Sequence, residues 1–224
     1  MSANVGTLAR LRARIKDGFG VKTTATAGNE FTATKMEVFI NMLIFGLLTM
    51  VTLGIGYCFF FVRFLKWIYS NTKINGKRIT FSGTGLQYFL KNLKWVLLSI
   101  LTIGIYGILC VPRDFCKFFV ENTHFEGETG TSEFKGGRIE FLLIMMASGF
   151  AFIFGPPMLL SYVVGNSVID GKKLSCHLNG FTLWAQNVYW SVMGIITFGF
   201  YFFLGAPFWR SAIEFVVENI SVEN

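Results

Sequence analysis

The distribution of charge along the chain constrains its fold more than any other feature. Asp, Glu, Lys and Arg are all missing from four stretches, at residues 38–62, 95–112, 141–169 and 174–209. A helix needs about 18 apolar residues to cross a bilayer, and one such run could still be a buried core helix. Four runs in a chain of 224 residues with only 15% charge are more than a globular domain usually contains. The sequence therefore predicts an integral membrane protein.

Three elements recur along the chain in the same order. The first is a Thr-x-Gly turn, at Thr52 and Gly54, Thr102 and Gly104, and Thr197 and Gly199. An arginine follows each turn, at Arg63, Arg113 and Arg210. The third is a link with an asparagine and a later glycine, at Asn71 and Gly76, Asn122 and Gly127, and Asn166 and Gly171. Ordered recurrence of this kind indicates duplication, and we expect four tandem repeats, at 36–85, 86–137, 138–180 and 181–224.

Each repeat has the pattern of a helical hairpin. An apolar helix leads to the Thr-x-Gly, where glycine permits a tight turn, and a second, partly amphipathic helix returns to the link. The link at 73–81 has an Asn-Gly pair between alternating residues, which is typical of a β-hairpin, and 170–173 predicts a similar turn. The predicted fold is an all-α integral membrane protein of four helical-hairpin units. It has up to eight short transmembrane or re-entrant helices and small β-hairpin links.

A competing model has four straight spanning helices, one for each charge-free run. That model places similar links on opposite faces and divides the 20 Lys and Arg residues almost equally between the two sides. The positive-inside rule favours an asymmetric distribution, which the hairpin model supplies by placing all of them on one face. The hairpin model is weakest in the second repeat, because its arms include Lys91, Lys94, Arg113 and Lys117. Those arms are short enough to be re-entrant.

The first 35 residues form a separate basic segment. Leu8, Leu11, Ile15 and Phe19 have helical spacing with arginines between them, which is typical of an amphipathic helix on an anionic bilayer surface. A disordered tail that orients the first insertion is an equal alternative, and an organellar transit peptide is a third.

The order of motifs in residues 52–83 resembles the YjgN-like bacterial inner-membrane proteins, a family of unknown function. The resemblance is best over 36–137. Cys58-Phe59 and Ile108-Leu109 stand where family members often have Pro-Trp. The resemblance implies a polytopic protein of the bacterial inner membrane, with both termini cytoplasmic in the hairpin model. It implies no activity and no catalytic residues.

No pattern of residues indicates catalysis or cofactor binding. Phosphate-binding, nucleophile-elbow and zinc-protease motifs are all missing from the sequence. His124 and His177 lie in separate links without neighbouring ligands, and the four cysteines have no zinc or redox spacing. We therefore expect no metal and no cofactor. The three arginines have two interpretations: contacts with lipid headgroups, or a ring of charge at a pore mouth.

Three functions remain open at this point. The first is a non-enzymatic structural or membrane-shaping protein that forms homo-oligomers and binds a lipid bilayer with anionic headgroups. The second is a channel or pore for ions or small solutes, and the third, least favoured, is a lipid-acting enzyme. No nucleic-acid partner is expected.

Overall fold

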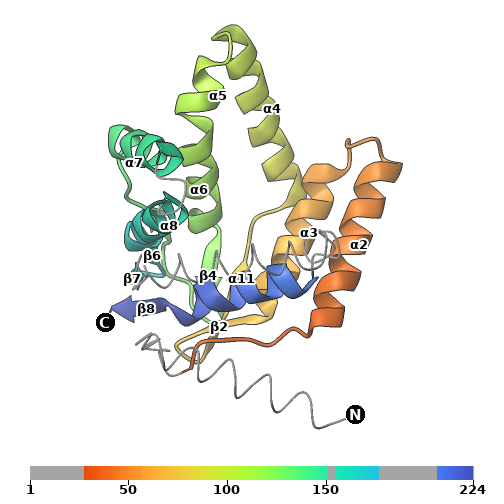
Figure 1. Ribbon diagram of the computed structural model, residues 1–224, viewed down its shortest axis with the longest axis vertical. Coiled ribbons are helices and arrows are strands. Elements are labelled where there is room, and N and C mark those ends of the chain that lie inside the picture. The colour runs from red at the N-terminus through yellow and green to blue at the C-terminus, as the bar shows by residue number, and fades with distance from the viewer. Residues whose placement is uncertain (1–27, 151–154, 177–205, 224) are drawn as a thin grey trace.

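The computed structural model describes residues 28–150, 155–176 and 206–223 (Figure 1). Within these ranges the chain forms two four-stranded antiparallel sheets, from which helices project. The strand order is β1-β2-β3-β4 in one sheet and β5-β6-β7-β8 in the other. Each sheet belongs to one half of the chain, so the described fold consists of two similar halves.

The first half places one helical segment between β1 and β2 and another between β3 and β4. Its elements in chain order are β1 (Glu30–Phe31), α2 (Lys35–Val51), α3 (Tyr57–Ser70), β2 (Thr72–Ile74), β3 (Lys77–Phe81), α4 (Gly85–Leu101), α5 (Ile105–Leu109), α6 (Val111–Glu121) and β4 (Thr123–Phe125). Both hairpins point away from the strands: the α4–α5 turn lies at the top of the molecule in Figure 1, and the α2–α3 turn lies lower, at its right-hand side.

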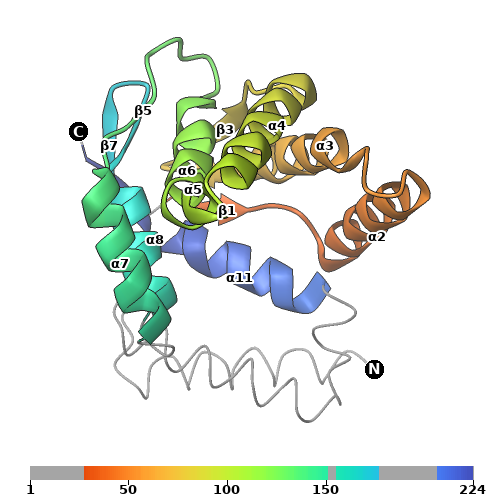
Figure 2. The same ribbon diagram turned by 90° about the horizontal axis from the view of Figure 1, so that it is seen from above.

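The second half repeats this order within the described residues. Its elements are β5 (Glu133–Phe134), α7 (Arg138–Phe150), α8 (Gly155–Gly165), β6 (Ser167–Ile169), β7 (Lys172–Cys176), α11 (Ala206–Glu218) and β8 (Ile220–Glu223). The α7–α8 pair points in a different direction from the first two hairpins, as the view from above shows (Figure 2). Among the described hairpins, the α7–α8 pair therefore differs in direction from the first two.

Local sequence explains the tight turn at the centre of each sheet. Asn75 and Gly76 join β2 to β3 with φ of 52° and 78°, and Asp170 and Gly171 join β6 to β7 with 49° and 78°. Positive φ at both central residues matches the twist of a two-residue hairpin, and Asn, Asp and Gly tolerate it best. The same chemistry thus sets the strand register in both halves.

Two long helices begin at capping boxes. The Thr34 hydroxyl accepts from the Glu37 amide, and the Glu37 carboxylate accepts from the Thr34 amide. Thr84 and Gln87 form the same reciprocal pair at the start of α4. These bonds satisfy amide groups that have no partner inside a helix. They fix the start of each helix a few residues after β1 and β3.

A cluster of buried apolar residues joins the two halves. It contains Ile74, Ile79 and Phe125 of the first half, and Val164, Ile169, Leu174 and Ile220 of the second. We call it the central cluster. Because it takes side chains from both sheets, neither half can bury it alone.

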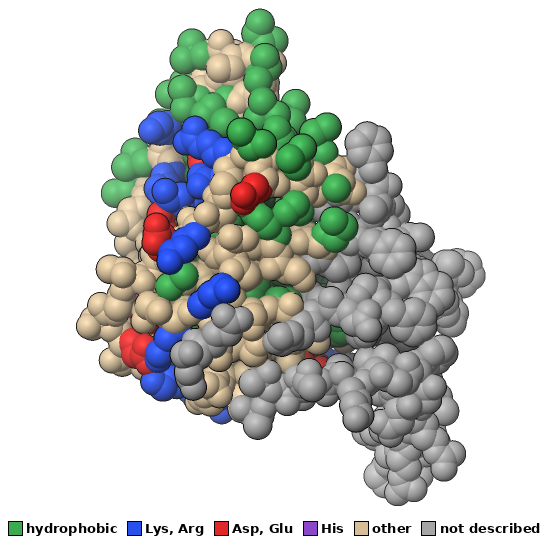
Figure 3. Space-filling model, turned by 90° about the vertical axis from the view of Figure 1, so that its left-hand side faces the viewer, with side chains coloured by type: hydrophobic (Ala, Val, Ile, Leu, Met, Phe, Trp, Pro, Cys, Tyr) green, Lys and Arg blue, Asp and Glu red, His purple; other side chains and the backbone are tan. Residues whose placement is uncertain are grey.

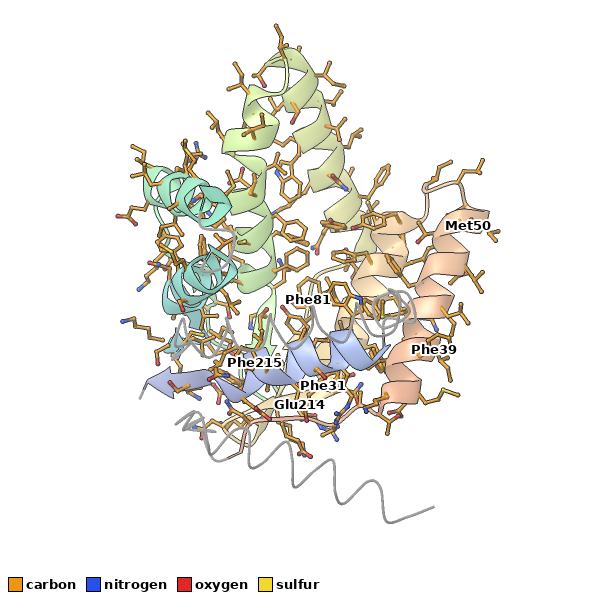
Figure 4. All side chains as sticks on the ribbon, viewed as in Figure 1. Phe31, Phe39, Met50, Phe81, Glu214 and Phe215 are labelled. Carbon is orange, nitrogen blue, oxygen red and sulfur yellow. The ribbon has the colours of Figure 1, made fainter. Side chains whose placement is uncertain are left out.

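The two halves also pack on each other reciprocally. Helix α6 of the first half lies against β5 and α7, and α11 of the second half lies against β1 and α2 (Figures 2 and 4). The Arg113 Nε donates to the Gly136 carbonyl at 2.9 Å, and the Arg210 Nε donates to the Ala33 carbonyl at 2.9 Å. The last helix of each half is thereby fixed to the first elements of the other.

The prediction of an all-α integral membrane protein is wrong. The described residues contain eight strands in two sheets, and the links expected as small separate β-hairpins pair across repeats. Among the described helices, none has both the length and the apolar character needed to cross a membrane. The prediction of transmembrane helices, and with it the bacterial inner-membrane location with cytoplasmic termini, is therefore corrected.

In the first half, the expected hairpin arms form helices that are each shorter than the 18 residues of a membrane span. The charge-free run 38–62 is divided between α2 and α3, and the chain reverses between Val51 and Tyr57, where the hairpin model expects its turn. The run 95–112 is divided among α4, α5 and α6, and α4 also contains Lys91 and Lys94. Much of the run 174–209 lies outside the described residues.

We predict that Phe125→Ala lowers the free energy of unfolding by about 3–5 kcal/mol, because it leaves a cavity in the central cluster. Phe125 is 2% exposed. Phe59→Ala is the control, since Phe59 is 47% exposed and we expect it to cost about 1 kcal/mol or less. Chemical denaturation followed by circular dichroism measures both. Equal losses in the two variants would contradict a core shared by the two halves.

Candidate functional site: the apolar hairpin ends

The turn between α2 and α3 is closed by its own hydrogen bonds. The Thr52 hydroxyl donates to the Leu48 carbonyl at 2.9 Å and accepts from the Gly56 amide at 3.1 Å. The Gly54 amide donates to the Thr49 carbonyl at 2.8 Å. Gly54 has φ of 83°, which glycine adopts without steric cost.

The turn between α4 and α5 has the same geometry. The Thr102 hydroxyl donates to the Leu98 carbonyl at 2.8 Å and accepts from the Tyr106 amide at 2.9 Å. The Gly104 amide donates to the Ser99 carbonyl at 2.7 Å, and Gly104 has φ of 85°. The Thr and Gly of each motif therefore have defined structural roles in the turn.

Both turns leave no amide donor without an acceptor. Every backbone N–H from 52 to 57 and from 102 to 106 donates to an oxygen of the same hairpin. The hydroxyls of Thr49 and Ser99 likewise donate to the carbonyls of Phe45 and Trp95, four residues earlier. In water, the amide donors of a turn can bond to solvent and need no internal acceptor. In an apolar medium, each unpaired donor is costly.

The side chains at these ends are apolar and exposed. Leu53 is 90% exposed and Ile103 is 93% exposed. The exposed apolar neighbours of Leu53 are Met50, Val51 and Ile55, and those of Ile103 are Ile100, Leu101, Ile105 and Ile108. Figure 3 shows apolar side chains covering the upper end of the molecule, with Lys and Arg side chains below them. Met50 lies at the far end of α2 from the strands (Figure 4). We refer to these two groups of residues as the apolar ends.

Leu53 and Ile103 also have an unfavourable backbone conformation. Their φ values are 50° and 51°, in the left-handed region where Gly, Asn and Asp are the usual residues. For a β-branched residue such as Ile103 this conformation is a true outlier. These large apolar side chains are therefore unfavourable in two ways: their backbone has a positive φ, and they are exposed to water. Such strain at exposed positions makes Leu53 and Ile103 candidates for a functional role.

The apolar surface continues along α2. One face of this helix packs on α3 through residues such as Phe45. The opposite, exposed face is also apolar, with Ile40, Leu43, Ile44 and Leu47. A helix that is apolar all round is normally surrounded by apolar material.

The three recurrent arginines do not have equivalent surroundings. Arg113 and Arg210 are partly buried and donate to backbone carbonyls of the other half, and each also pairs with a carboxylate, Asp114 or Glu214. Arg63 is exposed and lines a recess of about 20 Å³ with Asn41. Arg63 precedes its asparagine by eight residues and the others by nine, so it faces a different direction on its helix.

The link residues terminate helices and form turns. The Asn side chains each donate to the carbonyl four residues earlier, with 2.8 Å for Asn71, 2.7 Å for Asn122 and 2.9 Å for Asn166. Gly76, Gly127 and Gly171 all have φ near 80°. The link motif is therefore structural. Thr197 and Gly199, together with His177, lie outside the described residues.

A polar junction at the contact of the two halves has no signal in the sequence. The His124 Nδ1 lies 2.8 Å from the Asp170 carboxylate, which is fully buried and also accepts from the Phe125 amide at 2.6 Å. Glu128 bonds to both Lys77 and Lys172. His124 and Asp170 lie in different repeats, and only the packing of the two sheets brings them together.

This junction does not form a metal site or a nucleophilic centre. Across the described residues, no group of three or more His, Cys, Asp and Glu side chains is placed to hold a metal ion. The nearby hydroxyl of Ser132 donates to the Thr123 carbonyl and accepts from the Asp170 amide, so it serves to hold the two halves together.

Comparison with known proteins provides no further assignment. No family model matches the chain, and no match was found among curated proteins or solved structures. The resemblance to the YjgN-like proteins therefore stays a prediction.

We predict that protonating Glu128 weakens the contact between the halves. Hydrogen bonds from Lys172 and Lys77 lower the pKa of Glu128 below its usual value of 4.5. A lowered pKa means that the carboxylate stabilises the fold above the unfolded-state pKa, and that this stabilisation is lost as pH falls through the folded-state pKa. Glu128→Gln should therefore reduce the fall of the melting temperature below about pH 4.5.

The matched control is Glu126→Gln, at an exposed position two residues away in the same link. It should leave the acid dependence of the melting temperature unchanged. If Glu128→Gln retains the wild-type dependence, the junction does not contribute to stability as the structure implies.

Proposed function

We propose that the protein is a non-enzymatic structural protein that binds lipid bilayers, and that it does so by inserting the two apolar ends into one leaflet. The observation that carries this proposal is the pairing of exposed apolar side chains with turns whose backbone amide donors are all satisfied internally. In hydrocarbon, such an end gains from burying its side chains and leaves no amide donor unpaired.

The surface suits lipid better than a protein partner. A protein interface uses one face and carries roughly one hydrogen bond per 100–200 Å², yet the turns offer no free amide donor. Exposed apolar residues stand on both sides of each turn in the sequence, and Figure 3 shows apolar side chains over the upper end of the molecule. An isotropic apolar medium satisfies this arrangement without needing a complementary shape.

The positions of the charged residues limit the depth of insertion. In the second hairpin the charge-free part of α4 above Lys94 is 95–101, and the returning arm is charge-free from 105 to 112. At 1.5 Å per residue these arms extend about 10–12 Å. One leaflet contributes about 15 Å of the hydrocarbon core. Lys94 and Arg113 would then lie near the headgroups, where basic side chains are favourable.

Insertion into a single leaflet gives the proposed shaping activity a physical basis. Two wedges that enter one leaflet expand the area of that leaflet alone, which favours curvature. Bending a larger area needs several copies side by side, so the proposal includes self-association on the bilayer. The net charge of +7 favours anionic headgroups as partners.

We predict that Leu53→Asn and Ile103→Asn together weaken binding to vesicles while preserving the fold. Asn is well tolerated at positive φ, so the melting temperature should not fall. Each substitution removes a large apolar side chain from the lipid, worth about 1.5–3 kcal/mol, so we expect at least a 10-fold loss of partitioning for each. Flotation with phosphatidylglycerol vesicles measures partitioning, and calorimetry measures stability.

The control is Met36→Asn, which changes an exposed apolar residue at the sheet end of α2. It should float like the wild type. The proposal is wrong if the double variant floats normally or if the wild type does not float at all. Tubulation of large vesicles by the wild type, and its loss in the double variant, tests the shaping activity.

A further inference from the structure

The second hairpin contains an open groove between α4 and the α5–α6 arm. The groove has a volume of about 420 Å³. Trp95, Val96 and Ser99 line one side, and Gly104, Gly107 and Val111 line the other. Two of these residues are glycines, so the returning arm contributes few side chains to fill the space.

The groove differs chemically along its length. At the turn it ends at Ile103, which is apolar and exposed. At the other end lies Asn92, and next to it Lys91, which is four residues before Trp95 and so on the same face of α4. The Lys91 Nζ lies 4.7 Å from the centre of the Phe118 ring of α6. A cation thus lies beside the end of the groove that is nearer the strands.

The dimensions match those of a leaflet. From Asn92 to Ile103 the groove follows α4 for about 16 Å, compared with about 15 Å for the hydrocarbon of one leaflet. In the orientation of the proposed function, the Ile103 end lies deep in the leaflet and Lys91 lies at the headgroups. A lipid in that leaflet has its chain and its headgroup in the same order.

We infer that this groove holds one acyl chain of an anionic phospholipid, with the headgroup phosphate beside Lys91. The inference rests on the proposed function for the orientation of the lipid. Charge complementarity selects the headgroup, and the apolar lining selects the chain. A bound lipid of this kind covers the exposed side chains of Val96 and Ile100 and anchors the hairpin in the leaflet.

The test uses native mass spectrometry of the purified chain in nonionic detergent with added dioleoyl phosphatidylglycerol. We expect the wild type to retain one phospholipid per chain. Val96→Phe fills the groove and should reduce retention at least about 10-fold. Lys91→Gln should remove the preference for phosphatidylglycerol over phosphatidylcholine. The matched control is Leu97→Phe, because Leu97 is the next residue on α4 and is similarly exposed but does not line the groove.

The two proposals fail in different ways. Equal retention of phospholipid by Val96→Phe and Leu97→Phe would contradict the inference that the groove binds a phospholipid. A wild type that retains only free fatty acid would also contradict it. The proposed function is tested separately by vesicle flotation, in which Val96→Phe should still float because both apolar ends are intact. A wild type that floats but retains no phospholipid contradicts lipid binding in the groove and leaves the proposed function standing.

Discussion

The reciprocal packing of the two halves is the constraint on which the rest of the structure depends. The last helix of each half packs on the first strand and helix of the other, and an arginine fixes each contact to a backbone carbonyl. Between these contacts the central cluster buries seven apolar side chains, six from the strands of both sheets and Val164 from α8, each worth about 1.5–3 kcal/mol on burial. The sheets therefore form a shared base, and the hairpins project from it at set angles.

The hairpins depend on that base in a second way. Their outer ends bury little apolar surface against the chain itself, so the contacts that position them lie nearer the strands. Aromatic packing of Tyr88 with Phe118 and Phe119 joins α4 to α6, and Phe81 of β3 packs against both of those phenylalanines (Figure 4). Above this layer the turns rely on their own hydrogen bonds. Because the packing near the strands positions the hairpins, the apolar ends can contact lipid without loss of the fold.

Local features were accessible from the sequence, and long-range ones were not. The Asn-Gly turn of β2 and β3 could be predicted because positive φ depends only on the residues in the turn. The backbone reversals at Gly54 and Gly104 follow from the same kind of reasoning. The prediction of membrane-spanning helices failed because the arms on either side of these turns are too short to cross, and α4 also carries Lys91 and Lys94. The contact of His124 with Asp170 could not be predicted, since it depends on how the two sheets pack.

The sequence by itself determined which segments carry charge, where glycine permits a turn and which motifs recur. These properties belong to single residues and their neighbours, so they do not depend on the final fold. Only the tertiary structure decided that the links form two sheets, and that Arg113 and Arg210 join the halves while Arg63 stays exposed. It also decided that Leu53 and Ile103 remain uncovered. Hydrophobicity predicts that a side chain prefers to leave water, but the packing of the whole chain determines whether the chain itself can cover it.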